Sequence, residues 1–207
     1  RFRPHVKTSK CIEVAKAQRD AGALGITVST LKEAEQFFAE GFTDILYAVG
    51  MAPHRLPHAL ELRRRGCALG ILTDSVASAR AIVEFGRANG EAFDVLIEVD
   101  TDGRRSGIKP EEDALIEVGR VLHEGGMRLG GVLTHAGSSY ELDTPEALKA
   151  MAEQERSGCV RAAQRLLAIA WGVLVVGRVF TTPGRSAHNL HTFVNVCQDG
   201  PTHQARG

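Results

Sequence analysis

The feature that most constrains this sequence is a regular alternation of short apolar runs with longer amphipathic stretches. Each run is short enough for a buried strand, and the stretches between them, such as 31–38 and 79–85, carry apolar residues three and four positions apart, as amphipathic helices do. The runs lie at residues 25–30, 43–49, 67–73, 94–100, 129–135 and 173–177. With a further strand at 4–8, the pattern predicts an α/β fold with parallel strands.

The turn after the first expected strand distinguishes two α/β architectures. A doubly wound sheet normally carries Gly-x-Gly-x-x-Gly at that turn, whereas residues 8–11 read Thr-Ser-Lys-Cys. We therefore predict a TIM-type (β/α) barrel. A complete barrel takes ~250 residues. Because this chain has 207 residues, we expect an incomplete barrel with about seven strands.

The composition argues against several classes of protein. The 25 Lys and Arg residues balance 25 Asp and Glu residues, and only 5% of residues are aromatic, so we expect no nucleic-acid partner. No apolar run approaches the ~18 residues of a membrane span, and the first residues lack the apolar centre of a signal peptide, so we expect no membrane partner. The four cysteines are far apart in the sequence, which favours reduced thiols and a cytoplasmic location.

Unusual polar residues follow the apolar runs at the carboxyl ends of the expected strands, where barrel enzymes place their active sites. Lys7 in the first run would sit in a confined, partly desolvated place that favours imine formation, and an exposed lysine on a ragged edge is an equally balanced alternative. His135 and Tyr140 follow the run at 129–135. His135 could face a ligand or be a hydrogen-bonded core histidine.

Arg104 and Arg105 follow the run at 94–100 and form the third polar group. A guanidinium there could orient an anionic or phenolate atom of a ligand. The alternative is a loop in which the two arginines pair with Asp100 and Asp102. Each signal is modest, but all three fall at equivalent positions, so together they favour a ligand-binding face.

Three segments resemble one known family. Residues 3–10 (RPHVKTSK) are similar to the R-P-H-x-K-T-H-K signature of the D-serine dehydratase and D-threonine aldolase family, relatives of alanine racemase. Residues 100–108 (DTDGRRSGI) resemble that family's D-x-D-G-H-R-S-G-V segment, and residues 131–140 (GVLTHAGSSY) resemble its G-V-L-T-H-A-G-H-S-Y. The matches keep their order over most of residues 1–140, and together they are specific.

The resemblance implies an alanine-racemase-like barrel that binds pyridoxal 5'-phosphate (PLP). Lys7 would be the catalytic Schiff-base lysine, and its released amine would act as the base at the substrate Cα. Arg105 would lie against the phenolic oxygen of the cofactor, His135 beside its ring and Tyr140 near the ring or phosphate. The expected cofactor-binding residues are Lys7, His5, Arg105, His135, Tyr140 and Gly177.

The sequence departs from the family pattern at several places. Ser9 and Ser138 stand where the family has histidines, and Gly177 is only a partial echo of its phosphate loop. Residues 178–207 show neither a helical nor a strand period. We expect a partial PLP-binding barrel domain at 1–177 and an irregular tail at 178–207 that reflects a shifted reading frame or a truncation, with the family's C-terminal β domain absent.

The missing domain also determines what we expect of metal and partners. The resemblance places a divalent metal, zinc or manganese, in that domain of the full-length family member, so we assign no metal ligand in this chain. His188, His191, Cys197 and His203 match no standard zinc spacing. The resemblance also implies a homodimer when the protein is full length.

The activity that the resemblance implies is that of a PLP-dependent lyase acting on a small D-amino acid. D-serine dehydratase (ammonia-lyase) is the preferred reading. D-threonine aldolase, a carbon-carbon lyase, is the first alternative. A non-catalytic PLP-binding barrel or an inactive fragment is the second.

Overall fold

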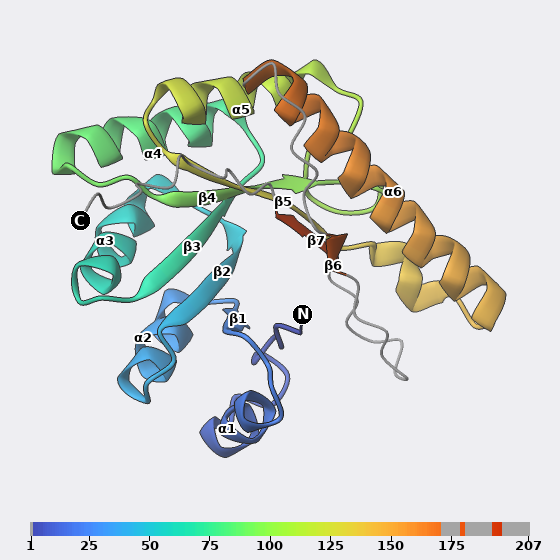
Figure 1. Ribbon diagram of the computed structural model, residues 1–207, viewed down its shortest axis with the longest axis horizontal. Coiled ribbons are helices and arrows are strands. Elements are labelled where there is room, and N and C mark those ends of the chain that lie inside the picture. The colour runs from blue at the N-terminus through green and yellow to red at the C-terminus, as the bar shows by residue number, and fades with distance from the viewer. Residues whose placement is uncertain (1, 171–178, 181–191, 196–207) are drawn as a thin grey trace, which may run out of the picture.

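The computed structural model describes residues 2–170, 179–180 and 192–195, and it places most of the apolar runs in one sheet (Figure 1). Adjacent strands of the first part are parallel and follow the order of the sequence. These strands are β1 (Ile26–Val28), β2 (Asp44–Gly50), β3 (Ala68–Thr73), β4 (Asp94–Val99) and β5 (Arg128–Thr134). The predicted α/β fold with parallel strands is confirmed.

Helices connect the strands and lie around the outside of the arc that the sheet forms (Figure 1). Side-chain caps begin three of them: Thr30 and Glu33 form a capping box at α2, the Ser75 side chain accepts from the Ser78 N–H at α4, and the Thr144 side chain accepts from the Ala147 N–H at α6. The helical elements are α1 (Ile12–Asp20), α2 (Leu31–Ala39), η1 (Pro53–Arg55), α3 (Leu56–Arg64), α4 (Val76–Asn89), α5 (Asp113–Glu124), η2 (Gly137–Glu141) and α6 (Pro145–Ala170).

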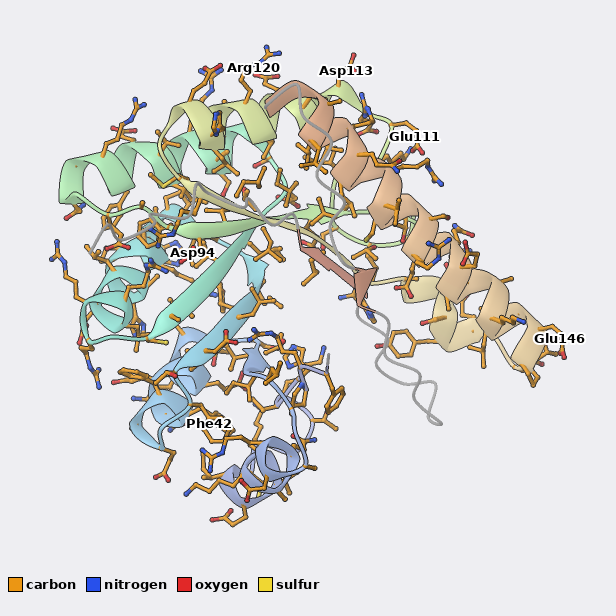
Figure 2. The ribbon with its side chains drawn as sticks, viewed as in Figure 1. Phe42, Asp94, Glu111, Asp113, Arg120 and Glu146 are labelled. Atoms are coloured by element: carbon orange, nitrogen blue, oxygen red, sulfur yellow. The ribbon has the colours of Figure 1, made fainter. Side chains whose placement is uncertain are left out.

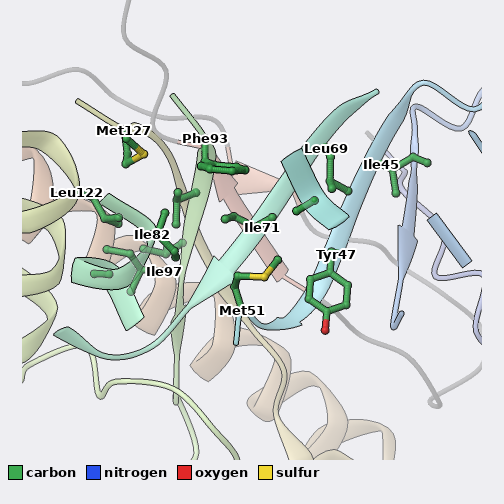
Figure 3. Packing of buried hydrophobic residues seen from close by; sticks show 14 of the residues in the cluster. Ile45, Tyr47, Met51, Leu69, Ile71, Ile82, Phe93, Ile97, Leu122 and Met127 are labelled. Atoms are coloured by element: carbon green, nitrogen blue, oxygen red, sulfur yellow. The ribbon is translucent and has the colours of Figure 1, made fainter. Parts of the chain in front are cut away.

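The two faces of the sheet bury different residues, because successive side chains of a strand point to opposite faces. The main core fills the space between the outer face and the helices. It includes Ile45, Tyr47, Leu69, Ile71, Ile82, Phe93, Ile97, Leu122 and Met127 (Figure 3). A second cluster on the inner face consists of Leu46, Leu72, Leu96 and Leu133. Burial on both faces explains why the strands read as continuous apolar runs.

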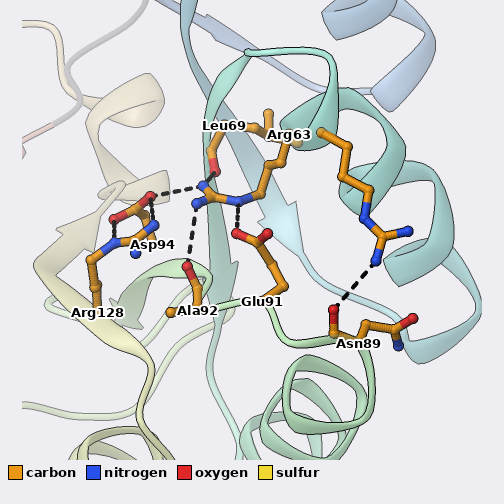
Figure 4. A network of polar contacts seen from close by, with 8 residues as sticks. Arg63, Leu69, Asn89, Glu91, Ala92, Asp94 and Arg128 are labelled. Atoms are coloured by element: carbon orange, nitrogen blue, oxygen red, sulfur yellow. Dashed lines mark hydrogen bonds and ion pairs between the residues drawn. The ribbon is translucent and has the colours of Figure 1, made fainter.

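The amino ends of the strands are closed by a polar network (Figure 4). The Arg63 guanidinium donates to the Glu91 carboxylate and to the Asp94 carboxylate, 2.7 Å in each case, and also to the carbonyl oxygens of Leu69 and Ala92. Arg128 at the start of β5 holds the same Asp94 from the other side, at 2.7 Å. The strand ends opposite the predicted site are therefore tied together.

The first helix is held to the sheet around Phe42. Figure 2 shows Phe42 between α1 and α2. Its ring meets the Phe37 ring of α2 edge to face, with centroids 5.6 Å apart, and the Arg19 guanidinium of α1 lies 5.0 Å from its centroid. These contacts hold the end of α1 against the segment between α2 and β2.

The structure differs from expectation at both ends of the chain. The strand expected at 4–8 is reduced to a single parallel bridge between His5 and Thr27. The chain then turns, because the Lys10 N–H donates to the Val6 carbonyl at 2.8 Å. Two short strands, β6 (Val179–Phe180) and β7 (Thr192–Asn195), fall in the segment 178–207 where the sequence showed no period. β7 pairs antiparallel with β5 and β6 with β7, and the expected strand at 173–177 lies outside the described residues.

Candidate active site

The strand register places several predicted residues on one face of the sheet. His5 bridges Thr27, which pairs with Leu46 of the inner cluster. Paired residues of adjacent strands share a face, so His5 belongs to the inner face. Leu133 is also in the inner cluster, and His135 follows it by two residues. Both residues therefore belong to the inner face: His5 is level with Leu46 in the register, and His135 follows the carboxyl end of β5, beyond Leu133.

His5 is held between the Lys7 turn and β1. The Lys7 backbone N–H donates to His5 Nδ1 at 3.3 Å, and His5 Nε2 lies 3.3 Å from Ser29 Oγ. Burial and the positive charge of Lys7 lower the His5 pKa to about 4, with a further lowering from His135 and an opposing effect of Glu33. His5 is therefore a neutral imidazole at neutral pH, and it lies close enough to Lys7 and His135 for their charges to lower its pKa.

Lys7 is exposed in the turn that follows the His5 bridge, not confined within a strand. Val6 at the start of the turn is buried in the core, with 1% of its surface exposed. The turn ends at Lys10, whose backbone is left-handed with a φ of 47°. Glu33 secures it further, because its Oε1 lies 3.3 Å from Lys10 Nζ while its Oε2 accepts the Ser29 N–H at 2.8 Å. Glu33 was not among the site residues predicted from the sequence, although the Thr30-x-x-Glu33 capping box is a recognisable signal.

His135 and Tyr140 form a pair at the end of β5. His135 is 8% exposed, and its Nε2 lies 3.2 Å from the Tyr140 hydroxyl. The two rings meet edge to face, with centroids 5.6 Å apart, while Tyr140 itself is half exposed. The structure thus brings together two of the residues predicted from the sequence, one buried and one open to solvent.

The loop at 100–107 is organised by its own carboxylates. Asp100 Oδ1 accepts the N–H groups of Asp102 and Gly103. Asp102 Oδ2 accepts both the backbone N–H and the hydroxyl of Ser138, each at 2.8 Å. Burial opposes ionisation of Asp102, but the hydrogen bonds from Ser138 and from the Arg104 N–H lower its pKa below the usual value. These carboxylates therefore bind N–H and O–H groups, where the alternative reading expected ion pairs with the arginines.

Arg105 lies over the end of β5. A Cβ atom built on Gly137 would come 2.8 Å from Arg105 Cγ and 2.9 Å from its Cδ, but 3.7 Å from Arg104 Cβ. The Arg105 stem therefore occupies the space that the glycine leaves, beside residues 135–138, which we call the His135 segment. Its charge also acts on Glu98, whose pKa is raised by burial and by Asp74 and lowered by the Ser106 hydroxyl and by Arg105.

Two cavities in the described part of the chain lie away from this rim. One of about 120 Å³ lies beside Phe42 and Arg19, where β1 and β2 begin. Another of about 340 Å³ lies between α5 and α6, next to Leu129 near the start of β5. Neither is lined by the predicted residues, so we identify the candidate site from the convergence of polar groups.

Gly177 and the four His and Cys residues considered for a metal cannot be placed. All of them lie outside the described residues. Within the described residues, no three His, Cys, Asp or Glu side chains are arranged to hold a metal ion, and no helix there is long and apolar enough to cross a membrane.

Comparison with known proteins identifies the relatives of this chain. It is 72% identical over 169 residues to D-threo-3-hydroxyaspartate dehydratase of Delftia sp. strain HT23, 81% of this chain and 44% of that protein. D-serine dehydratase of Dictyostelium discoideum is 30% identical over 166 residues, 74% of this chain and 42% of the relative. D-threonine aldolase of Arthrobacter sp. is 28% identical over 168 residues, covering 81% and 42%. The chain thus spans less than half the length of these relatives.

Solved structures agree with this relationship. The Delftia dehydratase superposes with a TM-score of 0.80 over 81% of this chain and 45% of its own. An alanine racemase-like protein from Idiomarina loihiensis, 40% identical, gives 0.75 over 84% of this chain and 45% of its own. The alanine racemase N-terminal domain family matches residues 1–175, which confirms the resemblance and the alanine-racemase-like fold. This chain therefore belongs to the alanine racemase N-terminal domain family.

Proposed function

We propose that this chain is the PLP-binding part of a lyase that dehydrates a D-3-hydroxy amino acid, with D-threo-3-hydroxyaspartate as the preferred substrate. The observation that carries this proposal is the 72% identity with D-threo-3-hydroxyaspartate dehydratase. D-serine, the substrate favoured from the sequence, becomes the second choice because the Dictyostelium D-serine dehydratase is 30% identical.

The groups at the rim suit such a cofactor. The groups that support the proposal are an amine (Lys7), a guanidinium (Arg105), the imidazoles of His5 and His135 and the phenol of Tyr140, which come from separate segments of the chain. The amine can react with the aldehyde of the cofactor, and the guanidinium can bind its phenolate oxygen. The imidazoles and the phenol can lie against its aromatic ring. The absence of a Cβ at Gly137 leaves room for the Arg105 stem beside the His135 segment.

When bound, PLP would supply an electron sink for charge that develops at the substrate Cα. Lys7 would hold the cofactor through Nζ and, once displaced by the substrate amine, take the Cα proton at the same atom. His5 would remain an uncharged neighbour, since its pKa is about 4. Arg105 would keep the phenolic oxygen ionised, the buried His135 would lie beside the ring, and the half-exposed Tyr140 would lie near the ring or the phosphate.

Dehydration requires loss of the Cα proton and of the Cβ hydroxyl as water. Hydrolysis of the resulting enamine then gives a 2-oxo acid and ammonia. A Lewis acid assists departure of a hydroxyl, and a variant of the Delftia dehydratase has been solved in a metal-free form. We therefore propose that a divalent metal, zinc or manganese, acts in the full-length protein, which we also propose to be a homodimer.

The proposal is tested by measuring product release from D-threo-3-hydroxyaspartate, D-serine and D-threonine, with PLP and zinc or manganese present. We expect a 2-oxo acid and ammonia, formed with the highest kcat/KM from the hydroxyaspartate. Preferential turnover of D-serine would contradict the substrate assignment. Release of glycine and acetaldehyde from D-threonine would indicate an aldolase instead. Binding of PLP without any turnover, in a protein that includes the C-terminal domain, would indicate a non-catalytic barrel.

A further inference from the structure

A buried carboxyl group lies directly beneath the His135 segment. Glu155 of α6 is 1% exposed. Its Oε1 accepts the Ala136 N–H at 2.7 Å, and its Oε2 has no hydrogen-bond partner among the described residues. A buried, half-satisfied carboxyl group is costly to the fold. Our sequence analysis did not identify it.

The position of Glu155 is fixed by the packing of its own helix. Gln154 Nε2 donates to the Thr101 carbonyl at 2.7 Å. About one turn further along, a Cβ on Gly158 would lie 2.6 Å from Thr101 Cγ2, so α6 approaches the loop as closely as a glycine allows. Glu155 lies between these two contacts and cannot withdraw from the Ala136 N–H without moving the helix.

Glu155 and Asp102 hold the same segment from two sides. Asp102 accepts the Ser138 N–H and Glu155 accepts the Ala136 N–H. The two bonds flank Gly137, the residue over which Arg105 lies. The segment between the bonds begins directly after His135, so its position determines how that imidazole is presented at the rim.

Burial, and to a smaller extent the charge of Asp102, favour the neutral form of Glu155. Burial raises the Glu155 pKa to about 7, the Ala136 N–H opposes this, and the charge of Asp102 adds to it. Cys159, one turn along α6, has a pKa raised to about 12 and so remains an uncharged thiol. Two further titratable groups, His135 and Tyr140, stand on either side of the held segment.

We propose that Glu155 is a positioning residue whose carboxylate fixes the Ala136 N–H and whose protonation loosens the His135 segment. A carboxylate makes a shorter and stronger hydrogen bond than a carboxylic acid. The segment is therefore held firmly when Glu155 is ionised and less firmly when it is protonated. The consequence for cofactor binding rests on the proposed function, whereas the hold on Ala136 does not.

The hold is tested by the chemical shift of the Ala136 amide in the cofactor-free full chain. Labelling His at the carbonyl carbon with ¹³C and Ala with ¹⁵N selects the two His-Ala steps of the sequence, 58–59 and 135–136. Ala59→Ser removes one of the two signals and so assigns both. We expect the Ala136 signal to titrate with a midpoint near pH 7, and this titration to disappear in Glu155→Gln.

Two results would overturn the proposal. One is an Ala136 signal that stays constant between about pH 5.5 and 8.5, the range that brackets a midpoint near 7. The other is a titration that persists unchanged in Glu155→Gln, which would assign it to His135. If Glu155→Gln does not fold, Asp102→Asn replaces it, because removing that charge should lower the midpoint. An unchanged midpoint in Asp102→Asn would refute the proposal equally.

The dissociation constant of PLP provides the functional readout. We expect PLP to bind more weakly as the pH falls through 7 in the wild type, and this pH dependence to be lost in Glu155→Gln. Glu153→Gln is the matched control, since Glu153 lies on the same helix but is exposed and pairs with Arg156. It should keep the wild-type profile. If PLP does not bind to either protein while the Ala136 titration holds, the proposed function fails and the role of Glu155 stands.

Discussion

Replacing Gly137 with alanine tests whether Arg105 contributes to the cofactor site. The new Cβ would lie 2.8 Å from Arg105 Cγ, whereas carbon atoms pack at about 3.5 to 4.0 Å. The arginine stem must therefore move by roughly 1 Å. A hydrogen bond from a charged group to an oxygen contributes about 1.5 to 3 kcal/mol. Losing it should raise the dissociation constant of PLP roughly 10- to 150-fold.

The fold should tolerate this change. Gly137 does not have the left-handed φ that favours glycine, and Arg105 is an exposed, flexible side chain that can move away. Restricting the unfolded chain also offsets about 0.4 to 1 kcal/mol of any cost. We therefore expect the free energy of unfolding to change by less than about 1 kcal/mol.

The assay is a PLP titration followed by visible absorbance, combined with urea denaturation. Gly50→Ala is the control, because a Cβ there meets nothing within 4 Å. In an Arg105→Ala background, Gly137→Ala should have no additional effect on binding. An unchanged dissociation constant in a folded Gly137→Ala protein would refute the placement of Arg105 at the cofactor. So would an equal loss in the Arg105→Ala background.

Three further predictions concern other groups. Arg105→Ala should weaken PLP binding or shift its visible spectrum, while Arg104→Ala should do much less; equal effects in the absorbance titration would argue for a merely solvated loop. His5 has a pKa of about 4, below the 6.5 of an unfolded histidine, so the unfolded chain binds the proton first and stability falls as the pH drops from 6.5 to 4. Urea midpoints should show a shallower fall in His5→Gln, and parallel curves would contradict this. Arg63→Met should lower the free energy of unfolding by about 2 to 4 kcal/mol in urea denaturation, because it leaves the partners of a largely buried guanidinium unpaired. Arg128→Met removes a half-exposed side chain and should lower it by less than about 1 kcal/mol. Similar losses in the two variants would refute the network in Figure 4.

The strands β1 to β5 could be predicted because each one is buried on both faces and so reads as an apolar run. The strand predicted at 4–8 was wrong for a local reason. Pro4 has no N–H to donate to a neighbouring strand, and Lys10 adopts a left-handed conformation that closes the turn after Val6. Neither the turn nor the exposure of Lys7 is visible in the residue pattern.

The candidate site was predictable where the chemistry lies at strand ends and not where it depends on packing. His135 could be found because it follows an apolar run directly. Glu155 could not, because α6 is a helix of 26 residues that carries three carboxylates, Glu146, Glu153 and Glu155. Only the packing of α6 against the loop at 100–107 shows which of its carboxylates is buried. Ser138, noted as a departure from the family pattern, became intelligible through its two hydrogen bonds to Asp102.

We propose above that Lys7 is the residue that holds PLP. The direct measurement is borohydride reduction of the protein incubated with PLP, followed by peptide mapping. We expect one pyridoxyl group, on the peptide that contains Lys7. A label on Lys10 or Lys16 instead, or no label on any peptide, would contradict it.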